Sequence, residues 1–370
     1  MIAMWPMLFS LAMPSNQVVS EIAADEVVVF YPTYAHRTTD EKSWVLHIHG
    51  RIFEPEESSV KRALLLGVLR RSFGLSKGEE ETATFKARMR AFLVDNEREK
   101  TIHIRLGERI FRAGKSGPNG HFASDLVLPN EHIEAILAAN KENNRTIRFA
   151  ALLPSDDHRR FAGQIECIEP RGVSVISDVD DTIKISEVRN RRALLANTFL
   201  RDYQAVAGMA QVYEQWRMLG VRFHYVSASP WQLYGPISDF IASEKFPAGS
   251  LHMKMFRLKD ESALNLLAAQ HQYKPEVIAK ILADFPQRRF VLVGDSGEQD
   301  PEIFGDLART HEEQVARILI RHVGLQAKTD NRYQAAFKDL PRERWQVFDV
   351  AAELENAISA ALHDNKLDGN

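Results

Sequence analysis

The sequence has very little cysteine: among its 370 residues, Cys167 is the single example. One thiol excludes an internal disulfide framework and any cysteine-based zinc cluster. An excess of positive charge is also missing, since 47 basic and 50 acidic residues leave a net charge of -3. We therefore expect an ordinary globular protein without a nucleic-acid partner.

Long apolar runs are scarce as well. The stretch 1–12 resembles the apolar part of a secretory signal, but no Lys or Arg precedes it and Pro6 interrupts it. We expect residues 1–25 to be a leader or an irregular tail, with a cytoplasmic or membrane-surface location favoured over export. No other window approaches the roughly 18 apolar residues that span a bilayer, so any membrane contact should be peripheral.

The first half of the chain has the pattern of a β-rich domain. A length of 370 residues favours two domains. Over 26–170, short alternating or β-branched runs are separated by turn signals, and they predict strands at 26–31, 43–49, 101–105, 121–128 and 145–150. Helical patterns at 58–71 and 81–94 interrupt them. We expect a sandwich-like domain with helical insertions.

A different pattern begins near Pro170-Arg171-Gly172. Strands now alternate with helices, as in a parallel sheet with crossover helices. The helical stretches include 209–219 and 275–284, and apolar strands are expected at 173–177, 222–227, 289–294, 316–321 and 345–348. The fold class we expect for residues 171–370 is α/β, with a doubly wound parallel sheet.

Polar residues stand at the ends of three of these strands. The run Asp178-Val179-Asp180-Asp181-Thr182 follows the first, Ser227-Ala228-Ser229-Pro230 ends the second, and Asp295-Ser296-Gly297-Glu298-Gln299-Asp300 follows the third. A helical segment before the third strand begins at Lys274. Ligands of doubly wound sheets bind beyond the carboxyl ends of the strands, so we expect these residues to share one site.

Clustered carboxylates at one edge of a sheet create an electrostatic conflict. Each anion raises the pKa of its neighbours, and a divalent cation relieves the repulsion. Mg²⁺ prefers hard oxygen ligands and commonly takes one or two carboxylates together with a substrate phosphate. Asp178 and Asp295, at neighbouring strand ends, meet this requirement, and Mg²⁺ is the cofactor we expect.

These residues also resemble a known family. Asp178-Val179-Asp180-Asp181-Thr182, Ser227, Lys274 and Gly294-Asp295 with Asp300 resemble, in order, the four motifs of the haloacid-dehalogenase phosphatase superfamily. More narrowly, the runs 177–183, 225–231 and 294–303 are similar to the phosphatidate phosphatase catalytic domain of the fungal actin-patch type. The narrow resemblance covers about residues 125–325 and fades over the N-terminal half.

The resemblance implies a role for each matching residue. It makes Asp178 the nucleophile that takes the phosphoryl group as an aspartyl-phosphate, and it makes Asp180 the group that protonates the leaving alkoxide and then deprotonates water. Thr182 would support the loop, while Ser227 and Lys274 would hold the phosphoryl oxygens. The metal ligands implied are Asp178, Asp180 through its backbone carbonyl, Asp295 and Asp300, with Asp300 also orienting water or Lys274.

Several residues have competing interpretations. Ser229, before Pro230, is as good a helix cap as Ser227, and Lys254 is the rival of Lys274. By itself, the run 178–182 also suits a calcium-binding or capping turn. The run Asp295-Ser296-Gly297 resembles the segment around a serine-protease nucleophile, but no two-barrel pattern accompanies it.

Two histidines raise the question of a second metal site. His47 and His49 share one strand face, where they could ligate an ion. No carboxylate or cysteine stands at a useful spacing from them, so we expect ordinary sheet-surface residues.

The linkers between the motifs bear on the substrate. The gap 183–226 is helical and the gap 228–273 has room for one strand and two helices, so a large cap does not fit and an open site is expected. The alternative is that the N-terminal domain acts as a lid. A basic and apolar set in these linkers suits either an anionic lipid head group or an ordinary domain interface: Lys184, Arg189, Arg191, Arg192, Lys254, Arg257 and Lys259, with Trp231, Tyr234, Phe246 and Phe256.

The function we expect is that of a phosphatidate phosphatase, which releases diacylglycerol and phosphate and contacts a membrane surface peripherally. One alternative is a phosphatase for another phosphomonoester, such as a sugar phosphate or a phosphoprotein. A further alternative is a noncatalytic binding module that retains the fold.

Overall fold

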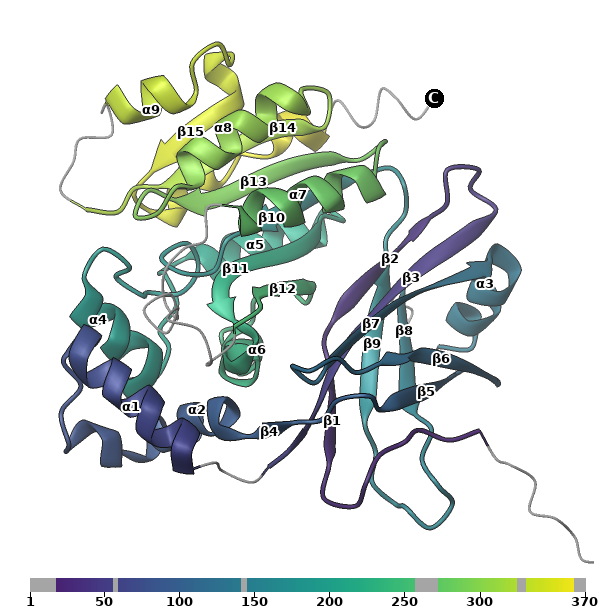
Figure 1. The fold of residues 1–370 in the computed structure, drawn as a ribbon. Coiled ribbons are helices and arrows are strands. Elements are labelled where there is room, and N and C mark those ends of the chain that lie inside the picture. The colour runs from purple at the N-terminus through teal and green to yellow at the C-terminus, as the bar shows by residue number, and fades with distance from the viewer. Residues whose placement is uncertain (1–17, 56–58, 141–144, 257–271, 325–330, 363–370) are drawn as a thin grey trace, which may run out of the picture.

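Two β-sheets organise the structure, a computed structural model that describes residues 18–55, 59–140, 145–256, 272–324 and 331–362 (Figure 1). One sheet is built from the N-terminal half of the chain and the other from the C-terminal half. Residues 18–25 contain no helix or strand, but Ser20 and Glu21 donate backbone hydrogen bonds to Leu152 and Thr101 of the first sheet. The expected leader over residues 1–17 lies outside the described residues.

The N-terminal sheet has nine strands in one hydrogen-bonded network, with the order β1-β3-β2-β9-β8-β5-β6 and with β4 and β7 paired to β3. Its strands are β1 (Val27–Phe30), β2 (Thr33–Arg37), β3 (Ser43–Glu54), β4 (Asp95–Asn96), β5 (Thr101–Leu106), β6 (Arg109–Lys115), β7 (His121–Pro129), β8 (Thr146–Ala151) and β9 (Ala162–Cys167). Helix α3 (Asn130–Ala138) follows β7. All five strands predicted for this half are present, but two separate stacked sheets are not confirmed.

Alternation along β3 divides the two faces of this sheet. Trp44, Leu46 and Ile48 are buried in the core that the sheet shares with α3. The intervening residues, including His47 and His49, point to the opposite face because successive side chains of a strand alternate. That opposite face covers the C-terminal half of the molecule.

The C-terminal sheet has six strands, all parallel, in the order β12-β11-β10-β13-β14-β15. They are β10 (Val173–Ser177), β11 (Arg222–Pro230), β12 (Ser250–Lys254), β13 (Arg289–Asp295), β14 (Val315–Arg321) and β15 (Trp345–Phe348). The order runs outward from β10 in both directions, so a crevice opens between the ends of β10 and β13. The expected α/β class with a parallel sheet is confirmed, while its haloacid-dehalogenase-like character stays a prediction.

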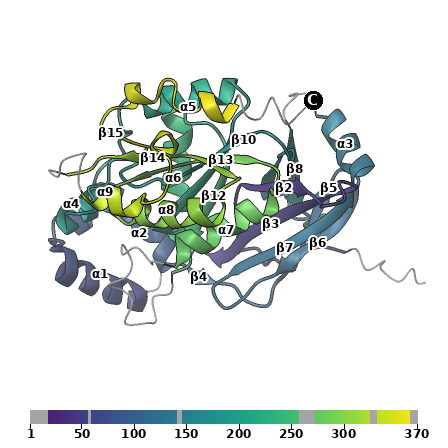
Figure 2. The same ribbon diagram turned by 90° about the horizontal axis from the view of Figure 1, so that it is seen from above.

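Helices cover both faces of this sheet (Figure 2). They are α4 (Arg191–Leu195), α5 (Met209–Met218), α6 (Tyr234–Ser243), α7 (Tyr273–Asp284), α8 (Asp300–Thr310) and α9 (Asn331–Ala336). On β13, Val291 and Val293 pack with α5 and α6, whereas Phe290 and Leu292 pack with α7, α8 and α9. A strand buried on both faces has to be apolar throughout, which explains why these strands are recognisable in the sequence.

The two helices inserted into the N-terminal half belong spatially to the C-terminal half. Helix α1 (Ser59–Phe73) and helix α2 (Ala83–Leu93) pack into the core that contains α5 and α6. Phe85 and Phe92 contact the ring of Phe199, and Arg88 Nη1 donates a hydrogen bond to the Thr198 carbonyl at 2.7 Å. None of the helices in the described segments is both long and apolar enough to cross a bilayer.

Aromatic side chains join the two sheets. Tyr31, after β1, lies against Trp231 with ring centroids 4.0 Å apart. Tyr34 of β2 belongs to the core cluster that also contains the buried residues of α7. The N–H of Leu251 in β12 donates to the Pro32 carbonyl at 3.1 Å. His49 lies in this contact, 3.0 Å from His121 and against Trp231. The sheet-surface interpretation of His47 and His49 is therefore wrong, because the second sheet covers that face.

The junction between the halves is tied down by Arg288. Its buried guanidinium donates hydrogen bonds to the carbonyls of Glu169, Arg171 and Val173 at 2.6 to 2.9 Å and to Ser174 Oγ at 2.7 Å. Gly172 lies at φ 121° against this guanidinium, where an added Cβ would be 2.9 Å from Nη1. One side chain thus fixes the chain where it passes from the first sheet to the second.

We expect Arg288→Met to lower the free energy of unfolding by about 3 kcal/mol or more, because it leaves several buried carbonyls without a donor. Denaturant titration followed by circular dichroism measures the change. Arg171→Met, at an exposed position of the same junction, is the control and should change stability by less than about 0.5 kcal/mol. Equal stability of the two variants would contradict the assigned role of Arg288.

Candidate active site

The ends of β10 and β13 place two carboxylates side by side. Ser177 is in register with Val293, and the backbone N–H of Asp178 donates to the Val293 carbonyl at 2.9 Å. Asp295 is the last residue of β13, and α8 begins five residues later at Asp300. Asp178, Asp295 and Asp300 are all buried, and ligand oxygens of the three lie within 4.8 Å of one another. The three carboxylates that the sequence predicted to share one site therefore lie together at the ends of these strands.

Lys274, the second residue of α7, supplies positive charge to this cluster. Its Nζ lies 2.9 Å from Asp178 Oδ1, 2.7 Å from Asp300 Oδ1 and 3.1 Å from Glu298 Oε2. Lys274 is only 4% exposed. Of the two candidate lysines, the structure brings Lys274 to Asp178, whereas Lys254 ends the edge strand β12.

Close approach of Asp300 to the strand depends on a glycine. Asp300 Oδ2 accepts a hydrogen bond from the backbone N–H of Asp295 at 3.2 Å. A Cβ on Gly294 would lie 2.4 Å from the same oxygen, which is closer than atoms pack. Asp295 Oδ1 accepts from the Gly297 N–H at 2.5 Å, while the buried Asp295 Oδ2 has no hydrogen-bond partner.

Burial makes this cluster electrostatically unfavourable. Desolvation raises the pKa of Asp178 well above its ordinary value, although Lys274 opposes the shift. Desolvation, together with repulsion from Asp300 and Asp178, raises the pKa of Asp295 well above its ordinary value too. A single lysine therefore does not neutralise the group, and an added cation would lower both pKa values.

The donor set suits Mg²⁺. Three buried carboxylates provide hard oxygens at one point, and Asp295 Oδ2 is a buried acceptor without a donor. The carboxylate of Asp180 is not a member of this group. If Asp180 ligates the ion, it does so through its backbone carbonyl, as the family resemblance implies.

Asp180 has its own dense set of partners. Its Oδ1 lies 2.7 Å from Lys184 Nζ and accepts from Ser186 Oγ at 2.6 Å. Its Oδ2 accepts from Ser227 Oγ at 3.1 Å and from Ser229 Oγ at 2.9 Å. Both candidate serines are therefore directed at Asp180.

These partners decide the charge of Asp180. Burial by itself would raise its pKa, but the ion pair with Lys184 and the hydroxyl donors outweigh desolvation and lower the pKa. Lys184 Nζ also donates to Ser186 Oγ and lies 4.7 Å from the centre of the Tyr203 ring. Asp180 is thus held as a carboxylate.

Asp181 organises the loop that follows Asp178 and Asp180 in the chain. Asp181 takes the left-handed conformation at φ 56°, which Asp tolerates better than most residues. Its carboxylate accepts from the backbone N–H groups of Ser186, Glu187 and Val188 at 2.7 to 2.8 Å. Thr182 Oγ1 donates to Asp178 Oδ2 at 3.0 Å, which agrees with the supporting role implied for it.

Four residues of this site escaped the sequence interpretation. Glu298 contacts Lys274, Lys184 and Ser186 contact Asp180, and Arg332 donates to the backbone carbonyls of Ser296 and Glu298. Glu298 stood in the acidic run that was singled out, so the signal for it was present. No sequence spacing points to Arg332, which reaches the loop from α9.

Five residues of the basic and apolar linker set, for which a lipid head group and a domain interface were both open, are interior. Lys184 and Lys254 are 1% and 2% exposed, and Trp231, Phe246 and Phe256 are buried in the core that contains α1, α2, α5 and α6. The head-group alternative is wrong for these five residues because they are buried, and Trp231, which contacts Tyr31 of the N-terminal half, follows the domain-interface alternative. Arg189, Arg191 and Arg192 are exposed, and Arg257 and Lys259 lie outside the described residues.

A parallel sheet whose neighbouring strand ends carry buried carboxylates and a lysine is an arrangement suited to binding an anion together with a metal ion. Comparison with known proteins is more specific. Residues 173–322 match the family model described as "Phosphatidate phosphatase APP1, catalytic domain". This segment, which contains Asp178, Asp180, Lys274 and Asp295, is thus similar to that catalytic-domain family.

Two curated fungal proteins are similar to the chain. Phosphatidate phosphatase APP1 of Saccharomyces cerevisiae is 36% identical over 158 residues, which cover 42% of this chain and 26% of that protein. An uncharacterized protein of Schizosaccharomyces pombe is 28% identical over 212 residues, which cover 55% of this chain and 33% of that protein. The chain thus spans about a quarter to a third of the length of these relatives.

Among solved structures, a Parabacteroides merdae beta-glucuronidase aligns with 84% of this chain and 34% of its own, at 9% identity and a TM-score of 0.24. A score this low carries no information about the fold.

We expect Asp295→Asn to stabilise the protein in the presence of a chelator by about 0.5 to 2 kcal/mol, because it removes one anion from the cluster. A carboxyl whose folded pKa is raised binds a proton that the unfolded chain has released, so its contribution to stability falls as pH rises above the unfolded value of 3.8. The advantage of the variant should therefore grow with pH.

Thermal unfolding of both proteins at several pH values tests this expectation. Asp306→Asn, on the exposed side of α8, is the matched control and should show no such trend. A variant less stable than the wild type at every pH would contradict the assignment of Asp295 to a repulsive cluster.

Proposed function

We propose that the chain is a Mg²⁺-dependent phosphatase that hydrolyses phosphatidate to diacylglycerol and phosphate. The observation that carries the proposal is Asp178, buried at the end of the central strand between Lys274 and the carboxylates of Asp295 and Asp300. The substrate class comes from the family of residues 173–322 and from the name of the yeast relative.

In the proposed reaction, a carboxylate oxygen of Asp178 attacks the phosphorus atom. A bond forms between that oxygen and phosphorus while the bond from phosphorus to the diacylglycerol oxygen breaks. Water then attacks the phosphorus of the aspartyl-phosphate, which releases inorganic phosphate and restores Asp178. Thr182, which donates to Asp178 Oδ2, orients the carboxylate so that its other oxygen faces the substrate.

Asp180 is the proton carrier in this scheme. In its carboxylate form, which Lys184 favours, it takes a proton from the attacking water. To protonate the leaving alkoxide first, Asp180 has to take up a proton from solvent when the substrate binds, and it returns the proton taken from water to solvent when phosphate leaves. An incoming phosphate promotes this gain in two ways: its negative charge raises the pKa of Asp180, and it competes for the hydroxyls of Ser227 and Ser229.

The remaining residues stabilise the transferred group. Lys274 supplies charge to phosphoryl oxygens, and Ser227 or Ser229 supplies a hydroxyl donor. Glu298 and Asp300 hold the Lys274 ammonium from the side away from the substrate. Bound Mg²⁺ would neutralise phosphate charge, with Asp178, Asp295, Asp300 and the Asp180 carbonyl as its protein ligands.

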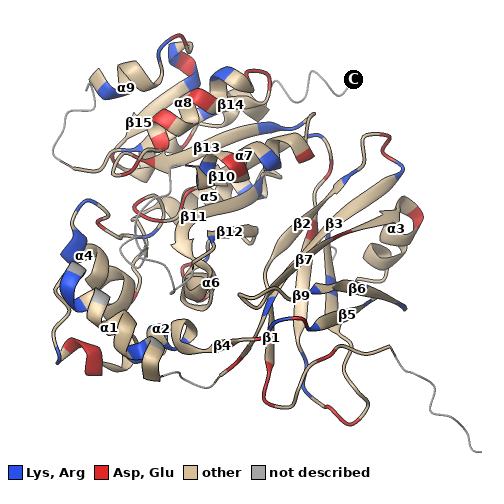
Figure 3. Ribbon diagram, in the orientation of Figure 1, with Lys and Arg blue, Asp and Glu red and all other residues tan. Residues whose placement is uncertain are grey.

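Helix α1 supports the choice of a lipid substrate over a soluble phosphoester. Val60 and Leu64 are 77% and 47% exposed on this helix. Arg70 and Arg71 lie in the last turn of the same helix, and Arg191 and Arg192 lie on α4, so both helices carry positive charge (Figure 3). Exposed apolar side chains among Lys and Arg suit peripheral contact with an anionic membrane.

The proposal is tested with phosphatidate vesicles, a sugar phosphate and a phosphopeptide, each assayed with Mg²⁺ and with a chelator. We expect turnover of phosphatidate that requires Mg²⁺ and that falls by at least about 1,000-fold in Asp178→Asn, because the amide is a poor nucleophile. Asp306→Asn is the control and should retain activity. Turnover of a soluble phosphoester alone would reject the lipid assignment, and wild-type activity in Asp178→Asn would reject Asp178 as the nucleophile. Absence of turnover of all three substrates by the wild type would favour a binding module.

Replacement of the α1 residues separates membrane contact from chemistry. We expect Val60→Glu with Leu64→Glu to lower the turnover of phosphatidate in anionic vesicles by roughly 10-fold, because burial of these side chains in the lipid is lost. Turnover of a short-chain, soluble phosphatidate should stay unchanged. Met218→Glu, which charges an equally exposed apolar site on α5, serves as control, and an equal loss in that variant would reject the role of α1.

A further inference from the structure

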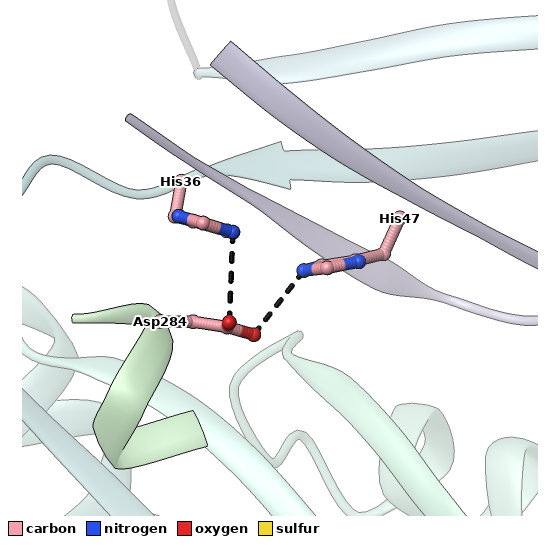
Figure 4. Close-up of side chains that lie close together, drawn as sticks. All are labelled: His36, His47 and Asp284. Atoms are coloured by element: carbon pink, nitrogen blue, oxygen red, sulfur yellow. Dashed lines mark ion pairs between the residues drawn. The ribbon is translucent and has the colours of Figure 1, made fainter. Parts of the chain in front are cut away.

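A second group of metal-binding side chains lies where the two sheets meet. His36 of β2 and His47 of β3 come from the N-terminal sheet, and Asp284 is the last residue of α7 (Figure 4). His47 Nε2 lies 3.3 Å from Asp284 Oδ2, and His36 Nε2 lies 3.7 Å from Asp284 Oδ1. The nearest of these residues in sequence are eleven apart, so only the fold brings them together.

The outer nitrogen of each ring is already held. His47 Nδ1 lies 2.6 Å from Asp125 Oδ1, and His36 Nδ1 lies 3.0 Å from the Arg37 carbonyl. Both partners are acceptors, so each Nδ1 carries the proton and each Nε2 of a neutral ring presents a lone pair. A carboxylate or carbonyl behind each histidine is the usual arrangement around a metal-bound imidazole.

The two lone pairs face an anion. His47 Nε2 is buried and makes no hydrogen bond, although it points at the Asp284 carboxylate. Two imidazole nitrogens and a carboxylate that converge on one point form a group that can bind a cation.

The spacing fits a tetrahedral metal ion. With metal–ligand distances of about 2.0 to 2.2 Å, neighbouring ligand atoms of a tetrahedral site lie roughly 3.3 to 3.6 Å apart. One ligand atom from each of the three residues lies within 4.8 Å of the other two, and each histidine Nε2 approaches one oxygen of Asp284, at 3.3 Å for Oδ2 and 3.7 Å for Oδ1. Two imidazoles and one carboxylate, with one position left for water, are a ligand set that Zn²⁺ takes in proteins.

We propose that His36, His47 and Asp284 form a binding site for a divalent transition metal ion, Zn²⁺ by ligand type, that joins the N-terminal sheet to the end of α7. A cavity of about 280 Å³, bordered by His36, Thr38, Glu41 and Asp284, would give the ion a route of entry and a place for the fourth, water ligand. The site is distinct from the all-carboxylate cluster around Asp178, which suits Mg²⁺.

The other contacts of Asp284 are compatible with this role. Asp284 Oδ2 accepts from the Tyr34 hydroxyl at 2.6 Å and lies 2.9 Å from Lys280 Nζ. Its Oδ1 has only the contact with His36 among the ion pairs described, and it is the oxygen positioned to bind the ion. The side chain of Lys280 is 58% exposed and can turn into solvent when a cation binds.

The ion would act on the position of α7. This helix begins with Tyr273 and Lys274 and ends at Asp284, and a 12-residue helix is about 18 Å long. A metal bound at its end would fix the helix against β2 and β3, and with it the lysine that pairs with Asp178. The bound metal ion would therefore position α7 and would take no part in the phosphoryl-transfer chemistry.

The test measures Zn²⁺ and Co²⁺ binding to the full chain in an Asp295→Asn background, which weakens the competing carboxylate site. We expect about one Zn²⁺ per chain, a rise in the thermal unfolding temperature, and for Co²⁺ the intense visible absorption of a tetrahedral site. The variants His36→Gln and Asp284→Asn should lose this binding. His158→Ala, at an exposed position of the N-terminal half, should keep it.

A further variant separates metal binding from a structural effect. Asp125 is 58% exposed and contacts only the outer nitrogen of His47 in this site, so Asp125→Asn should leave the fold intact but weaken Zn²⁺ binding by about 10- to 100-fold. Absence of Zn²⁺ binding in the parent, or equal binding in the parent and in His36→Gln, would overturn the proposal. In that event the group would be an ion pair with protonated histidine only.

Discussion

The active-site region depends on Lys274, because its positive charge compensates the buried negative charge of the carboxylates around it. Its ammonium group is the single buried cation among Asp178, Glu298 and Asp300 in the described structure, and Asp295 lies beside them. Removal of charge from water is costly, so every element around the cluster serves to place an opposite charge or a donor next to it. α7 brings the lysine, Gly294 admits Asp300 and the Asp181 turn directs the first loop. The negative charge that remains is what makes the group suitable for Mg²⁺ and phosphate.

The N-terminal sheet contributes to the structure around this site. Tyr31 and Tyr34 from the first sheet enter the two cores of the C-terminal half, and α1 and α2 complete one of them. α7 connects these features, because its first turn carries Lys274 while its last residue, Asp284, meets His36 and His47 of the first sheet. One helix therefore carries both the residue that meets the first sheet and the residue that pairs with the proposed nucleophile.

Sequence patterns located the strands and the site for a simple reason. Strands buried on both faces are apolar throughout, so the polar residues that follow them, such as Asp178 and Asp295, stand out. Patterns failed where a side chain's surroundings are set by distant segments. For Lys184 and Trp231 the sequence left a lipid head group and a domain interface open, whereas in the structure Lys184 is buried against Asp180 and Trp231 lies against Tyr31. His47 lacked a carboxylate neighbour in sequence and has two in space.

The sequence by itself determined the parallel α/β sheet, the order of its polar strand ends and the resemblance of its motifs to a phosphatase family, because periodicity and short motifs are local properties of the chain. Only the tertiary structure decided which lysine reaches Asp178, that both Ser227 and Ser229 turn toward Asp180, and that helices from the first half complete the second. These facts depend on contacts between residues far apart in the chain, and such contacts produce no recognisable spacing in the sequence. The histidines beside Asp284 are the clearest case, since β2, β3 and α7 must all be folded before the three side chains meet.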